Sequence, residues 1–240
     1  MLNEIRKVIQ LAHPNLMRYF DVILLEQSNA LGEKEQLQIG VMEYANAGDL
    51  KQFARANPGS AQLEDLLAEV LHGLAYLHAK GIVHRGLKAQ NILLVHQGER
   101  LTAKLADFGV SKDLGQAGKS SSVMVGTIEY MAPEQFSPQR YGIDGKIGPS
   151  LDLWSFGVMV HELLTGRTPF GGRDGAMTTE QIMRAILSSE LPAGVEQLPE
   201  PYRSVIERCL VADAKDRIRS ANELLRYFDG GASPAAAVAP

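Results

Sequence analysis

The sequence has a single cysteine, Cys209, among 240 residues, so no disulfide can form within the chain. Structural disulfides belong to oxidising compartments, and their absence here is consistent with a reducing one. The chain also lacks an excess of basic residues, since it has 24 Lys and Arg against 28 Asp and Glu. The basic residues do not cluster into a run. A chain with this charge balance lacks the basic surface that nucleic acids need, so no nucleic-acid partner is expected.

Long apolar stretches are absent as well. The most apolar segment, LDLWSFGVMVHELL, is too short to span a bilayer and contains Asp152, His161 and Glu162. The first ten residues, MLNEIRKVIQ, carry charges where a signal peptide has its apolar stretch. These absences predict a cytoplasmic location and no membrane partner. The composition that remains, 45% hydrophobic and 22% charged, is typical of a globular chain.

The spacing of apolar residues divides the chain into a short part with strands and a longer helical part. Two runs predict strands, one around residues 16–25 and one within EQLQIGVMEY (35–44), where apolar residues alternate with polar or small ones. The pattern then turns helical, and residues 151–164 are apolar on nearly all sides, which predicts a buried helix. A stripe with helical period consists of Leu63, Leu66, Leu67, Val70, Leu71, Leu74 and Leu77.

Three short motifs follow one another in the helical part: HRGLKAQN (84–91), DFG (107–109) and APE (132–134). Protein kinases carry H-R-D-L-x-x-x-N, D-F-G and A-P-E in this order. One such motif would be a weak signal, but three in order, followed by DLWSFGVMVHELLTGRTPF, are a strong one. The chain resembles the protein serine/threonine kinase family from Asn3 to about Phe228. Lys88, two residues after the acid position, is typical of serine/threonine rather than tyrosine kinases.

The resemblance implies an α+β, two-lobed fold. Residues 1–45 would form part of a small lobe, with a helix and about two strands, and residues 46–229 a mostly helical large lobe. The tail 230–240, GGASPAAAVAP, lacks the apolar bulk for a core and is predicted to be disordered. The implied activity is transfer of the ATP γ-phosphate to a serine or threonine of a protein substrate.

By the same resemblance, Asp107 and Asn91 would each hold a Mg²⁺ that neutralises the phosphates, and Lys88 would face the γ-phosphate. The bland alternative for these three residues is a loop whose polar side chains satisfy backbone groups. We favour the metal-binding and phosphate-binding roles because the motifs occur in order.

Four further positions would surround the adenine of ATP. Leu93 would lie beneath the base and Met42 at the back of the pocket, while the backbone of Glu43 and Ala45 would offer hydrogen bonds.

Four other residues match scaffold positions of the family. Glu134 and Arg217 would form a buried pair that ties the APE segment to a late helix. Asp152 would hold the backbone of the loop that contains Arg85. These roles are structural, and they imply a large lobe that folds normally.

Two family features are missing from the sequence. The position of the catalytic aspartate holds Gly86, which cannot accept a proton, and losing a general base costs roughly 10²–10⁴ in rate. The family's C-helix glutamate would be Glu4, preceded by only three residues, and the sequence has no G-x-G-x-x-G loop and no V-A-I-K lysine. We therefore expect phosphoryl transfer to be absent or severely impaired. We also expect the nucleotide-binding site to lack its upper half, which the glycine-rich loop and the lysine form in the family.

Three interpretations stay open at this point. The chain is an impaired kinase, a pseudokinase that serves as a binding scaffold or allosteric partner, or a fragment of a longer kinase. A two-stranded remnant of the small lobe would leave an open strand edge and a half-covered apolar face. We therefore expect a protein partner to cover that edge.

Overall fold

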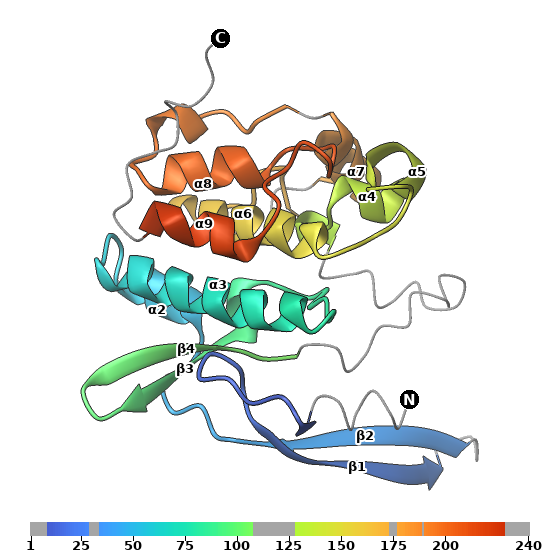
Figure 1. The fold of residues 1–240 in the computed structure, drawn as a ribbon, viewed down its shortest axis with the longest axis vertical. Helices are drawn as coiled ribbons and strands as arrows, with labels where there is room; N and C mark the ends of the chain where they lie inside the picture. The colour runs from blue at the N-terminus through green and yellow to red at the C-terminus, as the bar shows by residue number, and fades with distance from the viewer. Residues whose placement is uncertain (1–8, 29–33, 108–127, 173–176, 189, 229–240) are drawn as a thin grey trace.

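The computed structural model describes residues 9–28, 34–107, 128–172, 177–188 and 190–228 (Figure 1). A helical layer and two hairpins of strands make up this part, with the strands at one end of the molecule (Figure 1). Glu4, most of the first expected helix, the end of the DFG motif and the tail lie outside the described residues. No described helix has the length and apolar character needed to cross a membrane.

The first hairpin consists of β1 (Tyr19–Ser28) and β2 (Lys34–Met42), which pair antiparallel with Ile23 opposite Ile39. The sequence pattern predicted that the first strand begins at residue 16, three residues before the observed start of β1. Leu16 instead forms a parallel bridge to Leu105, and Met17 N donates to the Leu105 carbonyl at 2.9 Å. This stretch thereby fastens the hairpin to the rest of the molecule before β1 begins.

One face of this hairpin is apolar and open to solvent. Side chains of alternate residues on the two strands share a face. On this one Ile23 is 42% exposed, Leu25 45%, Ile39 42% and Val41 40%. A two-stranded ribbon with such a face gains little stability by itself.

The second hairpin joins β3 (Ile92–Gln97) to β4 (Arg100–Leu105) through a two-residue turn at Gly98 and Glu99. Gly98 has φ 65°, the left-handed conformation that a tight hairpin turn needs at its first position. The NILLV run was expected to be a strand, and it begins this hairpin.

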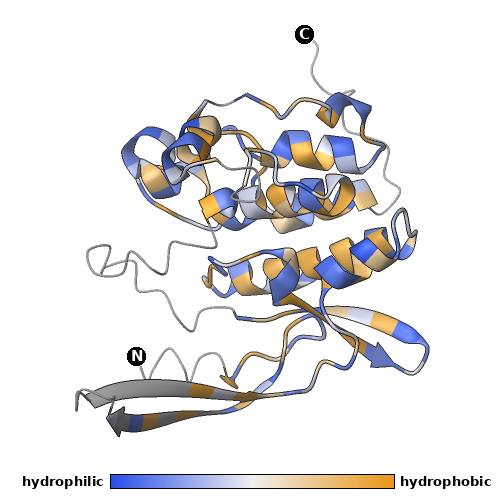
Figure 2. Cartoon of the chain, turned by 180° about the vertical axis from the view of Figure 1, so that it is seen from behind, coloured by the Kyte–Doolittle hydropathy of each residue, from blue (hydrophilic) through white to orange (hydrophobic). Residues whose placement is uncertain are grey.

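The helices follow the apolar pattern of the sequence, and both hydrophilic and hydrophobic residues occur on them (Figure 2). Short 3-10 turns lie at η1 (Ala89–Asn91), η4 (Ile128–Tyr130) and η6 (Val195–Gln197). The α-helices are α2 (Leu50–Ala56), α3 (Gln62–Ala79), α4 (Pro133–Phe136), α5 (Pro138–Tyr141), α6 (Ser150–Thr165), α7 (Thr179–Leu187), α8 (Tyr202–Cys209) and α9 (Ala221–Phe228).

Helix α6 is the centre of the core. Every residue from Leu151 to Glu162 is buried, as the sequence predicted for a helix that is apolar on nearly all sides. Gly157 lets α8 approach closely, since a Cβ at this position would lie 2.4 Å from the Cys209 Cβ. Such close packing makes α6 a rigid base for the loops that meet it.

Helix α3 lies between the helical layer and the second hairpin (Figure 1). Its leucine stripe is buried, with Leu67 and Leu74 fully excluded from solvent. The segment before β1 crosses helix α3 at Gly73. Glycine permits this close approach, since a Cβ at this position would lie 2.8 Å from the Asn15 carbonyl oxygen. Helix α3 therefore packs against the second hairpin and against the segment that leads into the first.

Candidate active site

The loop between α3 and β3 carries the HRGLKAQN motif and is held by Asp152 of α6. The Asp152 side chain is fully buried. Its Oδ2 accepts hydrogen bonds from the His84 backbone N–H and from His78 Nε2, both at 2.8 Å. Its Oδ1 accepts from the Arg85 N–H at 2.9 Å. One buried carboxylate from the core helix thus fixes the backbone at the start of the motif.

This anchoring supports an uncommon backbone conformation. Arg85 has φ 62°, in the left-handed region that non-glycine residues seldom adopt. Such strain persists where the surroundings determine it, as the Asp152 hydrogen bond does here. His84 packs inward beside it, and burial lowers the pKa of His84, so the neutral ring is favoured.

Gly86 follows in an ordinary backbone conformation, and nothing in the geometry requires glycine there. Its φ lies outside the left-handed region. A Cβ built on Gly86 would lie 3.7 Å from Asn91 Nδ2 and 3.8 Å from His84 Nδ1, which are normal contact distances. The loop therefore has room for the first atom of a larger side chain at this position.

Lys88, Asn91 and Asp107 are brought together by backbone hydrogen bonds. Asn91 N donates to the Lys88 carbonyl, and Ala106 N donates to the Asn91 carbonyl, each at 2.9 Å. The Asn91 side chain donates its Nδ2 to the Gly86 carbonyl at 2.8 Å, which leaves Oδ1 as an acceptor. Asp107 is exposed, two residues after the end of β4, with φ 58°. Two oxygen donors of the kind that Mg²⁺ prefers therefore lie on neighbouring segments.

The described residues hold no cluster of three or more His, Cys, Asp or Glu side chains that would bind a metal alone. Mg²⁺ in phosphoryl-transfer sites keeps waters and phosphate oxygens and uses only one or two protein ligands. The small donor set of Asn91 and Asp107 fits such a shared ion.

Tyr19 of β1 is a neighbour of Asp107 that the sequence did not suggest. Its pKa is raised, first by burial and then by the negative charge of Asp107. The tyrosine is 5% exposed, so the phenol lies in the core beside the candidate metal ligand. Nothing in the sequence pattern distinguishes this tyrosine from other strand residues.

The hinge residues Met42, Glu43 and Ala45 link the first hairpin to the helical part. The Glu43 Oε1 accepts from the Lys104 Nζ and from the Arg18 backbone N–H, both at 2.8 Å. The side chain of Lys104 is 8% exposed, so this ion pair is largely shielded from water. Within the described part of the chain, no hydrogen bond uses the Glu43 carbonyl or the Ala45 backbone.

The segment after the hinge is hydrogen-bonded to β3. Ala47 N donates to the Leu94 carbonyl at 3.1 Å, and Leu94 N donates to the Gly48 carbonyl at 2.9 Å. Leu93, half-buried, forms a bridge with Asp49. The hinge backbone and Leu93 therefore share one region of the surface, while Met42 at the end of β2 is 36% exposed.

Glu134 and Arg217 form a bidentate ion pair with both side chains fully buried. Arg217 Nη1 donates to Glu134 Oε1 at 2.7 Å, and Nη2 donates to Oε2 at 2.9 Å. The guanidinium also donates to the carbonyls of Val211 and Ala212 and lies over the Trp154 ring. This network ties the APE segment to the loop before α9.

A second buried network connects three elements. The Tyr130 hydroxyl donates to Glu162 Oε2, and the Lys51 Nζ donates to Glu162 Oε1 at 2.8 Å. Burial and the Glu162 charge raise the pKa of Tyr130, so the phenol stays protonated. The three residues belong to η4, α6 and α2. They are far apart in the sequence, so the sequence pattern did not predict that they are in contact.

Taken together, a helical lobe built on α6, a hinge to a strand hairpin and the anchored HRGLKAQN loop define a serine/threonine-protein-kinase-like domain. The family model described as "Protein kinase domain" matches residues 1–227 of this chain. The chain belongs to the protein kinase domain family, and the resemblance seen in its motifs is confirmed.

Bacterial and plant kinases are among its relatives. The probable serine/threonine-protein kinase PknB of Bifidobacterium longum is 31% identical over 99% of this chain and 34% of its own length. Mitogen-activated protein kinase kinase 9 of Arabidopsis thaliana is 38% identical over 74% of this chain and 56% of its own. The chain thus spans roughly a third to just over half of the length of these curated relatives.

A solved structure supports the two-lobed kinase fold. Rad53 residues 1–466 in complex with AMP-PNP superposes with a TM-score of 0.69 at 26% identity. The match covers 94% of this chain and 53% of that one.

Proposed function

We propose that this chain is a serine/threonine protein kinase domain that has lost most or all phosphoryl transfer and acts by binding other proteins. The observation that carries the proposal is Gly86, which stands at the base position of an otherwise ordered motif. A general base contributes roughly 10²–10⁴ to rate, and glycine supplies none.

None of the carboxylates that the structure describes beside the loop replaces the missing one. Asp152 is fully buried and its oxygens accept three hydrogen bonds from the loop and His78, so it cannot reach a substrate. Asp107 is the acid that the family uses for Mg²⁺, and proton abstraction would compete with that role. Neither of these two described acids therefore compensates for the loss at Gly86.

The family uses ATP and Mg²⁺, and the residues of this chain fit part of that role. Asn91 Oδ1 and Asp107 would hold the metal, Lys88 would face the phosphates, and Met42 and Leu93 would border the base. The Glu43 carbonyl and the Ala45 backbone would bind its edge. Bound Mg²⁺ would supply positive charge to the phosphate oxygens. The AMP-PNP in the Rad53 complex supports this assignment.

The apolar face of the β1–β2 hairpin supports a protein partner. Ile23, Leu25, Ile39 and Val41 leave a contiguous apolar strip exposed on a two-stranded ribbon. A partner that packs on this strip would bury its apolar surface, and a strand added beside the hairpin would satisfy the free edge.

The alternative function is an active kinase whose glycine-rich loop and lysine belong to further sequence. Gly86 argues against it, because the base position lies inside this chain.

The test of the lost activity is transfer of radiolabelled phosphate from Mg·ATP to a generic protein substrate. We expect the unaltered chain to label the substrate no faster than the Asp107→Asn variant, in which the candidate metal ligand has lost its charge. Asparagine suits the left-handed backbone at 107, so this change keeps the local fold. Turnover of the unaltered chain at about 1–100 s⁻¹, as in active kinases, would contradict the proposal.

Nucleotide binding is tested separately by thermal unfolding. A ligand at about 100 times its Kd adds roughly 2.7 kcal/mol to the free energy of unfolding. For a domain of this size we expect Mg·ATP to raise the midpoint by about 5–10 °C. Asp107→Asn should abolish the rise, whereas Asp216→Asn, at an exposed aspartate outside the site, should keep it. An equal rise in both variants would exclude Asp107 as a metal ligand.

A further inference from the structure

A cavity of about 440 Å³ lies where the segment before β1 meets the hinge and β4. Ile9, Ala12 and Pro14 of that segment line this hinge cavity, together with Glu43 of the hinge and Lys104 of β4. Its volume is within the range of about 300–1,000 Å³ that is typical of small-molecule sites. Three segments that are far apart in the sequence thus build one concave site.

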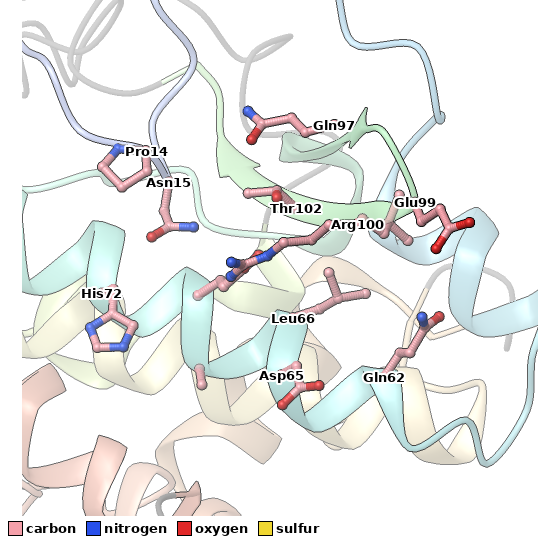
Figure 3. Close-up of a pocket in the computed structure, with 13 residues that line it drawn as sticks. Pro14, Asn15, Gln62, Asp65, Leu66, His72, Gln97, Glu99, Arg100 and Thr102 are labelled. Atoms are coloured by element: carbon pink, nitrogen blue, oxygen red, sulfur yellow. The ribbon is translucent and has the colours of Figure 1, made fainter.

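A larger cavity of about 620 Å³ lies next to it, between α3 and the β3–β4 hairpin, and includes Glu69 in its lining. Figure 3 shows Pro14 and Asn15 at one end of the larger cavity, and Pro14 lines both. The lining of the larger cavity carries three carboxylates against one guanidinium. The hinge cavity has the opposite charge balance, so the two sites differ in the ligands that they attract.

Lys104 brings a buried ammonium group to the hinge cavity. Its side chain is 8% exposed, and its Nζ donates to Glu43 Oε1 at 2.8 Å. An ammonium group has three N–H donors, and among the described residues Glu43 is the one hydrogen-bond partner of Lys104. A charge that is largely shielded from water is stabilised by further hydrogen bonds. An acceptor inside the cavity would provide them.

Positive side chains outnumber negative ones in the lining of the hinge cavity. Arg18 lines it as well, and its guanidinium lies 5.5 Å from the centre of the Phe20 ring, with no ion pair to a carboxylate of the described ranges. Glu43 supplies the single carboxylate of the lining. The lining therefore favours an anionic group over a cationic one.

The remainder of the lining is mostly apolar. Ala12 and Pro14 are exposed and Ile9 is half-buried, so all three offer surface to a ligand. Burial lowers the pKa of His13, which also lines the cavity, so its ring is uncharged at neutral pH. Apolar surface beside two cations complements a molecule with one anionic end and a short hydrocarbon chain.

We propose that the hinge cavity binds a small aliphatic carboxylate. The carboxylate accepts hydrogen bonds from Lys104 Nζ and interacts with the Arg18 guanidinium, and the hydrocarbon chain packs on Ile9, Ala12 and Pro14. The ion pair between Lys104 and Glu43 is kept, because the ammonium uses its other donors for the ligand. The inference does not rest on the proposed loss of phosphoryl transfer, since neither Gly86 nor a candidate metal ligand lines this cavity.

The experiment is isothermal titration calorimetry of the unaltered chain with sodium octanoate. We expect saturable binding at one site. Octanol has the same hydrocarbon chain without the charge, and octylammonium carries the opposite charge, so neither should show saturable binding. Equal binding of octanol and octanoate would mean that the hydrocarbon chain alone is recognised, which would overturn the proposal, as would the absence of octanoate binding.

Two arginine variants locate the charge that matters. Arg18→Glu should weaken octanoate binding by about five- to tenfold because an attraction becomes a repulsion, while the Arg18 backbone N–H still donates to Glu43. Arg208→Glu makes the same change of net charge at an exposed position of α8, across α6 and α3 from the strands (Figure 1). We expect its affinity to stay within about twofold of the unaltered chain. Equal weakening in both variants would show attraction to overall charge only and contradict the proposal.

Lys104→Met removes the ammonium group and keeps most of the length of the side chain, so octanoate binding should be lost. Melting midpoints verify that each variant is folded, and the comparison of the two arginine variants decides the question if Lys104→Met does not fold. Octanoate that binds Lys104→Met as tightly as the unaltered chain would lie elsewhere, such as on the apolar strip of the β1–β2 hairpin, and the proposal would be wrong.

Discussion

Replacing Arg217 by leucine lowers the free energy of unfolding by about 3–5 kcal/mol, because the change leaves the Glu134 carboxylate buried without its partner. The guanidinium also satisfies the Val211 and Ala212 carbonyls, which lose their donors in the variant. For a domain of this size, the midpoint of thermal unfolding should fall by roughly 10 °C or more. Differential scanning calorimetry measures both quantities.

Arg219→Leu is the control for the loss of an arginine, since Arg219 is exposed two residues away. Its midpoint should change by little. A double variant with Glu134→Leu and Arg217→Leu should be more stable than the sum of the single changes predicts, because neither charge is then buried alone. If Arg217→Leu melts like the unaltered chain, the buried pair does not anchor the APE segment.

Gly86→Asp is expected to raise phosphoryl transfer by about 10²–10⁴ over the unaltered chain, measured as phosphate incorporated from Mg·ATP into a protein substrate. The physical reason is the room at this position, where a Cβ would meet Asn91 and His84 at no less than 3.7 Å. The new carboxylate would join a loop that Asp152 already holds in place.

Gly86→Asn is the control that distinguishes the basicity of the new carboxylate from its size. The asparagine side chain has the same shape as that of aspartate, but its amide cannot act as a general base. We expect no gain from it, and no gain from Gly86→Asp when Asp107→Asn is also present. Equal and measurable rates in Gly86→Asp and Gly86→Asn would sink the assignment of Gly86 to the base position. No turnover in either variant would instead assign the loss to the glycine-rich loop and lysine that this sequence lacks. Thermal midpoints near that of the unaltered chain confirm that each protein is folded.

Much of the fold was predictable because it depends on residues that are close in the sequence. The leucine stripe of α3 and the apolar α6 are periodic patterns, and local spacing decides which face or faces a helix buries. The kinase motifs predicted the family, and the domain match and the Rad53 superposition confirm it. The replacement of the catalytic aspartate by Gly86 was also evident from the sequence, because the motif shows which residue stands at each of its positions.

Other features were decided only by tertiary structure. Glu43 pairs with Lys104 across 61 residues, and Tyr19 lies beside Asp107 from a strand that sequence placed three residues too early. The cavity that ends at Glu69 exists because α3, the hairpin and the Pro14 segment meet. Local periodicity carries no information about such contacts, since they depend on how finished elements pack. The sequence by itself therefore determined the family and the missing carboxylate, whereas packing decided which charges are shielded, paired or open to a ligand.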